Sequence, residues 1–394
     1  MSNKTVYIVG GKRTPIGSFQ GALSDVSAPE LGATAISAIL ADTKIAAANI
    51  NEVIMGCVLP AGIGQAPARQ AAKKAGIPDS VGALTINKVC GSGLKAVMMA
   101  STSIKADEAD VIIAGGMESM SQAPYYLKTA RNGFRMGNQQ AIDGMIYDGL
   151  WDPYNDVHMG NCAEQCVNKY KFSREDQDAY AALSYERAQK AIADGAFKAE
   201  IAPVSVPQRK GDPLIVDSDE EPGRGNVAKL PSLKPAFDKN GSVTAGNASS
   251  INDGAAALLI ASEQGVKNNG LTPVAKIMGY TTHSQDPLWF TTAPVGAIEK
   301  LLQKLDWQVA DVDLFEINEA FAAVVMAAES DLKIPREKIN IRGGAVALGH
   351  PIGASGARVL ITLLHALKDT GKKRGVASLC IGGGEAVALA VELV

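Results

Sequence analysis

An internal repeat constrains this chain more than any other feature of its sequence. Asn51–Pro60 resembles Asp311–Ala320, and the helix start Cys90–Ala96 is matched by Gly353–Arg358. Each of these helix starts is followed by a helical segment and then by a strand that ends in glycines. Such repetition predicts two similar halves that face each other across a pseudo-twofold axis. The cleft between them is a natural place for an active site.

Strand-like and helix-like segments alternate within each half. Val6–Val9, Val53–Val58 and Val111–Ala114 are short apolar runs typical of buried strands, whereas Ala33–Leu40 has apolar residues at helical spacing. This alternation predicts an α/β fold in which helices cover the sheets.

The stretch Tyr125–Gly246 interrupts the alternation and contains a proline- and charge-rich run at Pro203–Pro235. One helix is predicted within it, at Ser173–Asp194, where Ser173 is a suitable N-cap with Asp176 three residues later. We interpret the stretch as a long insertion, and such excursions often form lids or binding surfaces.

Composition limits the classes of function. The chain has 394 residues, 46% of them hydrophobic and 20% charged, as expected for a globular protein with more than one core. A net charge of −3 and 5% aromatic residues disfavour nucleic-acid binding. The apolar run Ala255–Ala261 is far shorter than the roughly 18 residues that a membrane span needs. Five scattered cysteines and no leader-like pattern favour a cytoplasmic, reducing environment.

Cys90 is the first candidate for chemistry. It follows the strand-like Ala83–Ile86, lies in the glycine-rich Asn87–Lys95 and precedes a helical pattern. Free N–H groups and the macrodipole at a helix N-terminus favour a thiolate, which is the nucleophilic form. A small buried apolar cysteine is the alternative interpretation.

Three further polar residues follow strands or precede helices. His350 lies in a glycine-rich loop before the helical Ala357–Leu367, where an exposed imidazole could act as a base or cap the helix. Cys380 ends a strand and precedes three glycines whose N–H groups suit an oxyanion; the alternative is a core cysteine. Asn318 follows the strand-like Val312–Ile317, where such residues usually cap the next helix.

His158, Cys162 and Cys166 are spaced four residues apart and would form one stripe on a helix, as zinc ligands sometimes do. Gly160 favours a helix start after His158, which would break the stripe, and a fourth ligand is not evident nearby. We therefore predict no metal site.

Seven sequence blocks, in order, resemble the thiolases over essentially the whole chain, most closely their biosynthetic, short-chain type. The resemblance implies an α/β thiolase fold: two duplicated βαβ-type halves with mixed five-stranded sheets in αβαβα layers, plus an inserted loop domain. It divides the chain into 1–121 with 247–270, the insertion 122–246, and 271–394. The blocks are Asn87–Ala96, Pro235–Asp238, Val243–Ser249, Asn252–Ala255, Asn318–Ala322, Gly349–Arg358 and Cys380–Gly384.

The resemblance also implies a mechanism. Cys90 would accept the acyl group, His350 would take its proton, and Cys380 would remove a proton from the methyl group of a second acetyl-CoA. One oxyanion would lie at the N–H groups of Cys90 and Gly382, and the other at His350 with a water held by Asn318. The expected reaction joins two acetyl-CoA into acetoacetyl-CoA and CoA, or reverses this. It needs no cofactor, and a homotetramer is expected.

By the same resemblance, eight positions form the pocket for coenzyme A and a short acyl chain: Leu150, His158, Met159, Phe237, Ala245, Ser249, Ala320 and Phe321. Two features depart from the family pattern. The nucleotide contacts around Glu220–Lys229 are not cleanly placed, which leaves only Arg224 and Lys229 as candidates. Glu385 replaces an uncharged residue after the triple glycine and could perturb Cys380 or face solvent.

Three other functions compete with this interpretation. A ketoacyl synthase shares the fold but lacks the second cysteine, so Cys380 argues against it. A silent acyl-CoA-binding protein would not need Cys90, His350 and Cys380 together. A cysteine hydrolase would need neither Cys380 nor an insertion that binds coenzyme A.

Overall fold

The computed structural model describes residues 4–394. Its main sheet contains strands from both halves, in the order β14-β15-β16-β13-β1-β12-β5-β3-β4, and the short β2 pairs with β12. Two residue pairs between β1 and β13 join the halves. The strands are β1 (Val6–Arg13), β2 (Gly17–Ser18), β3 (Glu52–Gly56), β4 (Gly82–Ile86), β5 (Val111–Ser119), β12 (Asn252–Ser262), β13 (Ala275–Ser284), β14 (Leu314–Ile317), β15 (Arg374–Ile381) and β16 (Glu385–Leu393).

The two halves repeat the same strand pattern. In the first, β3 runs parallel to β4 and β5, and β12 and β1 follow antiparallel. In the second, β14 runs parallel to β15, and β16 and β13 follow antiparallel. The segments that echo one another in sequence thus occupy equivalent places. The α/β thiolase fold class predicted from the sequence is confirmed in this respect.

One detail differs from the predicted pair of five-stranded sheets. Within residues 4–394 the second half contributes four strands, and the counterpart of β4 is a single parallel bridge between Phe315 and Ile339. The next residue, Asn340, has a left-handed φ of 46°. Its side chain bonds both the N–H and the C=O of Ile317, each at 2.8 Å. A side chain therefore takes the place of the missing strand.

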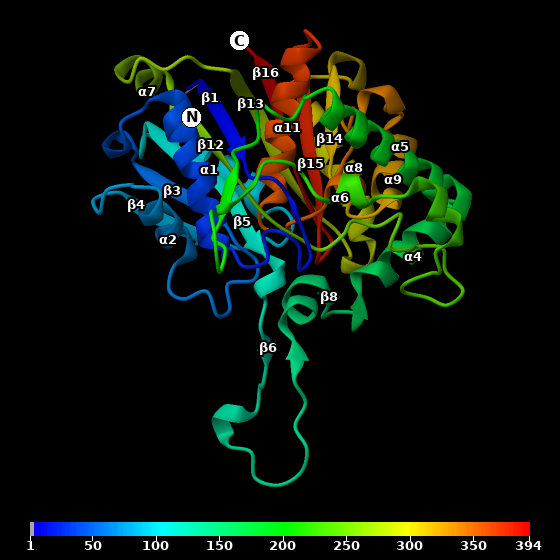
Figure 1. The fold of residues 1–394 in the computed structure, drawn as a ribbon. Helices are drawn as coiled ribbons and strands as arrows, with labels where there is room; N and C mark the ends of the chain where they lie inside the picture. The colour runs from blue at the N-terminus through cyan, green and yellow to red at the C-terminus, as the bar shows by residue number, and fades with distance from the viewer. Residues whose placement is uncertain (1–3) are drawn as a thin grey trace.

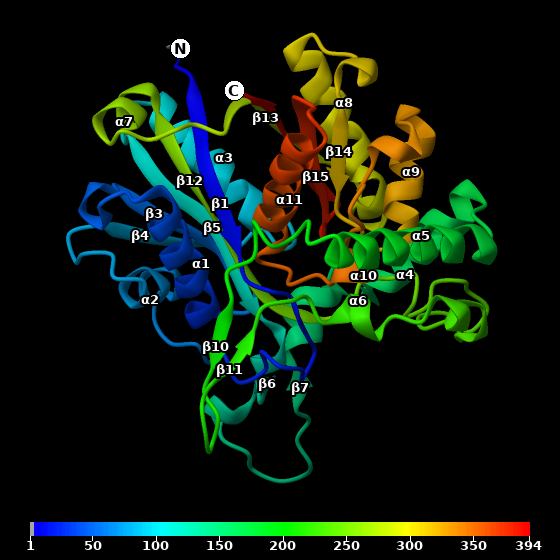
Figure 2. The same cartoon turned by 45° about the horizontal axis from the view of Figure 1, so that its top comes forward.

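The helices form the outer and middle layers (Figure 1, Figure 2). Two of them, α3 and α11, lie between the half-sheets, whereas α1 and α2 cover the outer face of the first half and α8 and α9 that of the second. The bounds are α1 (Ala28–Thr43), α2 (Pro67–Lys74), α3 (Ser92–Lys105), α7 (Glu263–Asn268), α8 (Ala293–Leu305), α9 (Ala322–Leu332), α10 (Ala345–Leu348) and α11 (Ser355–Asp369).

The two middle helices touch backbone to backbone near their N-termini. A Cβ on Gly356 would lie 2.2 Å from the Leu94 nitrogen, and one on Gly93 would lie 2.7 Å from the Ala357 nitrogen. Only glycine fits at such a distance. This contact brings the chain before α3, which carries Cys90, next to the loop before α11, which carries His350.

The insertion between β5 and β12 adds small sheets and helices, and the segment between β6 and β7 projects away from the body (Figure 1). Helix α5 has the predicted N-cap, because Ser173 and Asp176 form a reciprocal capping box. The division of the chain into three parts stays a prediction. The elements are β6 (Tyr125–Tyr126), β7 (Ile142–Asp143), β8 (Trp151–Asp152), β9 (Val157–His158), α4 (Met159–Tyr170), α5 (Arg174–Ala193), β10 (Val204–Val206), β11 (Leu214–Val216) and α6 (Glu221–Arg224).

Among residues 4–394, none of the helices combines the length and the apolar character that crossing a membrane would require.

Candidate active site

One pocket of about 320 Å³ brings together most of the residues singled out in the sequence. Cys90, His350 and Gly382 lie on its wall, although they come from three different elements. Asn318 and Cys380 are not on the wall and lie in a layer behind it. The other predicted residues on the wall are Leu150, His158, Met159, Phe237, Ala245, Ser249, Ala320 and Phe321.

The turn that carries Cys90 is strained and strongly held. Val89, directly before it, has a φ of 44°, which is unusual for a β-branched residue. Its N–H donates to the Asn87 side chain at 2.9 Å, and its C=O accepts from the Ser92 hydroxyl at 2.7 Å. The same hydroxyl accepts from the Lys88 N–H at 2.8 Å. These bonds fix the direction in which the Cys90 sulfur points.

Cys90 rests as a neutral thiol. Burial raises its pKa to about 11, although N–H groups of Gly382 and of Cys90 itself act in the opposite direction. The sequence-based expectation of a thiolate at the start of α3 is therefore wrong for the resting protein, because burial outweighs the N–H groups that face the sulfur. A base must take the proton when the sulfur reacts.

His350 is buried, with 5% of its surface exposed, so the predicted exposed imidazole is wrong. Its Nδ1 lies 2.6 Å from the Ser355 hydroxyl, which donates to the Pro351 carbonyl at 2.9 Å. That hydroxyl must accept from Nδ1–H, which leaves Nε2 without a proton. Burial, with a smaller effect of the Arg358 cation, lowers the His350 pKa to about 3. His350 is therefore a neutral base.

Asn318 does not cap a helix. Helix α9 begins four residues later, at Ala322, and Phe321 occupies its N-cap position. The Asn318 amide nitrogen instead lies 3.3 Å from Nε2 of His350 and donates to it. The capping expectation is wrong because a non-helical segment with a bend at Ala320 separates Asn318 from the helix, and the amide meets the histidine instead.

Cys380, near the end of β15, is fully buried in an apolar cluster that includes the wall residues Met159 and Phe321. Burial and the neighbouring Cys90 raise the pKa of its thiol well above the ordinary value. The following glycines turn the chain sharply, with φ values of 91° at Gly383 and 81° at Gly384. The turn points the Gly382 N–H toward the Cys90 sulfur.

Aromatic rings form one wall of the pocket. Phe237 stacks on His158 with ring centroids 4.8 Å apart and meets Phe321 edge-on at 6.0 Å. Ser249 is held next to Phe321, since both its N–H and its hydroxyl donate to the Ala320 carbonyl. Such a narrow, mostly apolar space suits a short acyl chain.

The His158, Cys162 and Cys166 stripe is interrupted as predicted. His158 is the N-cap of α4, and its Nδ1 accepts from the Gly160 N–H at 3.0 Å. The Cys162 sulfur faces Asp152, and the Cys166 sulfur faces the Ala323 carbonyl. Each of the three side chains thus has its own partner on the protein.

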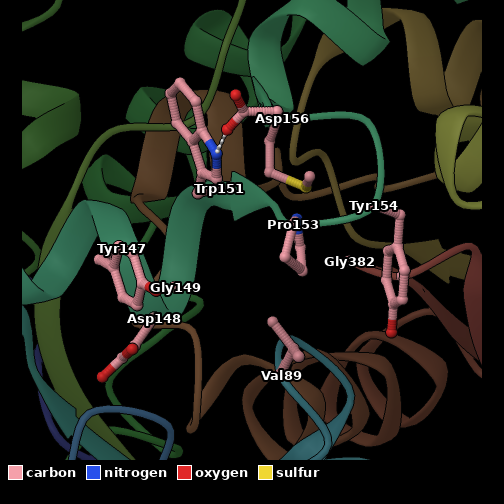
Figure 3. A pocket seen from close by; sticks show the side chains of 11 residues that line it. Val89, Tyr147, Asp148, Gly149, Trp151, Pro153, Tyr154, Asp156 and Gly382 are labelled. Atoms are coloured by element: carbon pink, nitrogen blue, oxygen red, sulfur yellow. Dashed lines mark hydrogen bonds between the residues drawn. The ribbon is translucent and has the colours of Figure 1, made fainter.

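A second, outer pocket of about 470 Å³ adjoins the first and shares Val89, Gly149, Met159 and Gly382 with it. Figure 3 shows this pocket from nearby, with Trp151 bonded to Asp156 on one side and Val89 on the other. The wall between the two pockets thus contains the residue before Cys90 and one of the glycines after Cys380.

Both features that depart from the family pattern have defined surroundings in the structure. Glu385 neither contacts Cys380 nor points freely into solvent, because it forms an ion pair with Lys88. Arg224 forms an ion pair with Glu220, and Lys229 is exposed. Neither of these two cations lies on the pocket wall.

Sequence reasoning missed Glu118, which joins two loops to the end of β5. Its carboxylate accepts N–H bonds from Val58, Leu59 and Gly353, at 2.9 to 3.1 Å. Burial raises its pKa to about 7. An acidic residue near the end of the otherwise apolar β5 was the available signal. Phe290 and Met120, which also line the pocket, carry no comparable signal.

A duplicated α/β fold whose cleft holds a cysteine, a neutral histidine and inward-facing backbone N–H groups defines a class: thiol-dependent acyl-transfer enzymes. Comparison with known protein families supports this class. Residues 6–264 match the thiolase N-terminal domain, and residues 271–393 match the thiolase C-terminal domain. The chain belongs to the thiolase family.

Individual relatives are similar over nearly the whole chain. A probable acetyl-CoA acyltransferase of Staphylococcus aureus (strain NCTC 8325 / PS 47) is 52% identical over 98% of both chains. An acetyl-CoA acetyltransferase of Allochromatium vinosum is 51% identical over 99% of both. The crystal structure of the Bacillus anthracis acetyl-CoA acetyltransferase superposes with a TM-score of 0.96, at 42% identity over 99% of both chains.

Proposed function

We propose that this thiolase condenses two acetyl-CoA molecules into acetoacetyl-CoA and free CoA, and catalyses the reverse thiolysis. The single observation that carries the proposal is the small pocket shared by Cys90, His350 and Gly382, with Cys380 directly behind it. Its size favours acyl groups of two to four carbons.

In the first half-reaction, Nε2 of His350 takes the Cys90 proton while the sulfur attacks the acetyl carbonyl. The carbonyl oxygen becomes an oxyanion, which the backbone N–H groups of Cys90 and Gly382 stabilise. The C–S bond to coenzyme A then breaks, and the departing thiolate takes the proton of the Cys380 thiol, which leaves Cys380 as a thiolate and Nε2 of His350 protonated. The acetyl group remains on Cys90 as a thioester.

In the second half-reaction, the Cys380 thiolate removes a proton from the methyl group of a second acetyl-CoA and becomes a thiol again. The enolate oxygen is stabilised by protonated Nε2 of His350 and by a water bound to Asn318. The carbanion attacks the acetyl-Cys90 carbonyl, the C–S bond to Cys90 breaks, the Cys90 sulfur takes its proton back from His350, and acetoacetyl-CoA leaves. Each preorganised donor contributes about 3–4 kcal/mol to lowering the barrier.

These donors and proton acceptors supply the chemistry from the chain itself, so we propose that the enzyme needs no cofactor. We also propose that it works in the cytoplasm as a homotetramer and does not bind nucleic acid. The free thiols of all five cysteines and the net charge of −3 support these proposals.

Replacement of Cys380 tests the assignment. Cys380→Ser should abolish condensation of acetyl-CoA but still allow acetylation of Cys90, detected as added mass on the intact protein. Cys162→Ser is the matched control, since it changes another buried thiol that is not on the pocket wall, and it should keep both activities. Full condensation by Cys380→Ser would refute the role of this residue.

A wild-type enzyme that consumes acetyl-CoA without forming acetoacetyl-CoA would refute the proposed reaction. Release of acetate would point to a hydrolase, and stable binding without acetylation of Cys90 would point to a silent acyl-CoA-binding protein.

A further inference from the structure

The turn that carries Cys90 and the glycine turn after β15 pack directly against each other. A Cβ on Gly91 would lie 2.4 Å from the Ile381 side chain, and one on Gly382 would lie 3.7 Å from the Val89 side chain. The Gly382 N–H also faces the Cys90 sulfur and acts to lower the pKa of its thiol. The relative position of these two turns therefore sets the distance between the sulfur and the N–H groups around it.

One ion pair joins the two turns outside the pocket lining. Lys88, two residues before Cys90, contacts Glu385, three residues after Gly382. The side chains are 24% and 33% exposed, and neither residue lines either pocket. Glu385 begins β16 and pairs with Ser284 of β13, whose hydroxyl donates to its carboxylate at 3.3 Å. Lys88 is thus attached to a stiff part of the sheet.

The backbone strain at Val89 requires contacts that hold the turn in place, and this attachment is one of them. A β-branched residue at a φ of 44° is strained, and such a conformation persists only where its surroundings enforce it. Local bonds to Asn87 and Ser92 hold the turn from within. The ion pair is the side-chain link between Lys88, next to Val89, and the opposite turn.

We propose that the Lys88–Glu385 pair is a positioning contact, which clamps the nucleophile turn against the glycine turn and so keeps the Cys90 sulfur beside the Gly382 N–H. Neither residue touches substrate or takes part in proton transfer. The proposal rests on the proposed function in so far as Gly382 stabilises an oxyanion. A partly exposed ion pair adds little to stability, so its effect should appear in the rate rather than in folding.

The test compares Glu385→Gln, Lys88→Gln and the charge-exchanged double variant Lys88→Glu/Glu385→Lys. Each single variant should lower kcat for acetoacetyl-CoA thiolysis about fivefold, with KM and the thermal midpoint nearly unchanged. The double variant should recover most of the loss. Lys190→Gln, which removes the exposed Lys190–Asp194 pair, is the matched control and should keep full activity.

A second measurement does not depend on the catalysed reaction. The rate of Cys90 alkylation by iodoacetamide at pH 8 should fall in both single variants and recover in the double variant, because a displaced Gly382 N–H no longer stabilises the thiolate. Unchanged kcat and alkylation rates in Glu385→Gln, or a double variant no better than the single ones, would overturn the clamp. Wild-type enzyme without thiolysis would refute the proposed function, whereas the alkylation series would still decide on the clamp.

Discussion

At the scale of single residues, the site depends on which nitrogen of His350 carries the proton. The Ser355 hydroxyl donates to the Pro351 carbonyl and so can only accept from Nδ1–H. The histidine therefore presents its basic nitrogen, Nε2, on the side of Asn318. A serine that does not line the pocket thus decides whether the base is available.

Ser355→Ala should lower kcat about tenfold, because the imidazole loses the bond that fixes its tautomer. Ser355→Thr keeps a hydroxyl and should retain most of the activity. The buried Ser101 forms no hydrogen bond through its hydroxyl, so Ser101→Ala is a suitable control. Steady-state kinetics and the ¹⁵N shifts of His350 would measure the effect. Unchanged shifts in Ser355→Ala would contradict the tautomer assignment.

The low pKa of His350 also makes stability depend on pH. The unfolded chain binds a proton at this histidine below about 6.5, whereas the folded protein does so only near 3. Between these values the unfolded state holds more protons, so the free energy of unfolding decreases as pH falls. The stabilisation that comes from the neutral His350 is complete above pH 6.5 and is lost progressively toward pH 3. Within this range, His350 makes the free energy of unfolding fall by up to about 1.4 kcal/mol for each pH unit.

Urea unfolding of wild type and His350→Asn between pH 7.5 and 4.5 would measure this contribution. We expect the wild type to lose more stability than the variant over that range. Parallel curves would mean that His350 titrates normally in the folded protein.

At the scale of elements, the contact between α3 and α11 aligns the two halves of the site. Both helices have a glycine at the crossing, and each glycine lies against the backbone of the other helix. The helices begin next to Cys90 and His350, so any added separation would be transmitted to these side chains. Close helix packing is thus a requirement of the active site as well as of the core.

Gly356→Ala should reduce kcat by about 100-fold or more and lower stability by roughly 1–3 kcal/mol, because the new methyl group overlaps the Leu94 backbone. Gly223→Ala is the matched control, since a Cβ there meets nothing within 4 Å. Kinetics and thermal unfolding would be compared in both variants. An active, stable Gly356→Ala enzyme would show that the helices can separate without consequence.

At the scale of the whole molecule, the segment between β6 and β7 exposes apolar side chains far from the body. Met136 is 97% exposed, Leu127 and Phe134 are also exposed, and so is Tyr125 in the adjoining β6. An exposed apolar group of this kind marks an interaction surface. It supports the proposed homotetramer, in which this segment would contact another copy of the chain.

Light scattering coupled to size exclusion should give four times the 41.0 kDa mass of one chain. Met136→Glu combined with Phe134→Glu should lower this mass, because charge on the segment opposes its burial. Ile215→Glu, on the separate β10–β11 hairpin, should leave it unchanged. A tetramer that survives the double change would assign its contacts to another surface.

Local pattern alone determined a large part of this protein. The alternation of apolar runs, the repeat of Asn51–Pro60 in Asp311–Ala320 and the cap at Ser173 depend on neighbours in sequence, so they could be predicted without coordinates. The motifs around Cys90 and His350 are similarly local, and they were sufficient to indicate a thiolase.

Tertiary structure alone decided the properties that depend on distant partners. Burial made Cys90 a neutral thiol and His350 a neutral base, and the Asn340 side chain replaced the fifth strand of the second half. Lys88 and Glu385 are 297 positions apart, so no local pattern could pair them. The physical reason is common to all of these. Desolvation and pairing energies depend on the groups that surround a side chain in space, and only the folded chain brings those groups together.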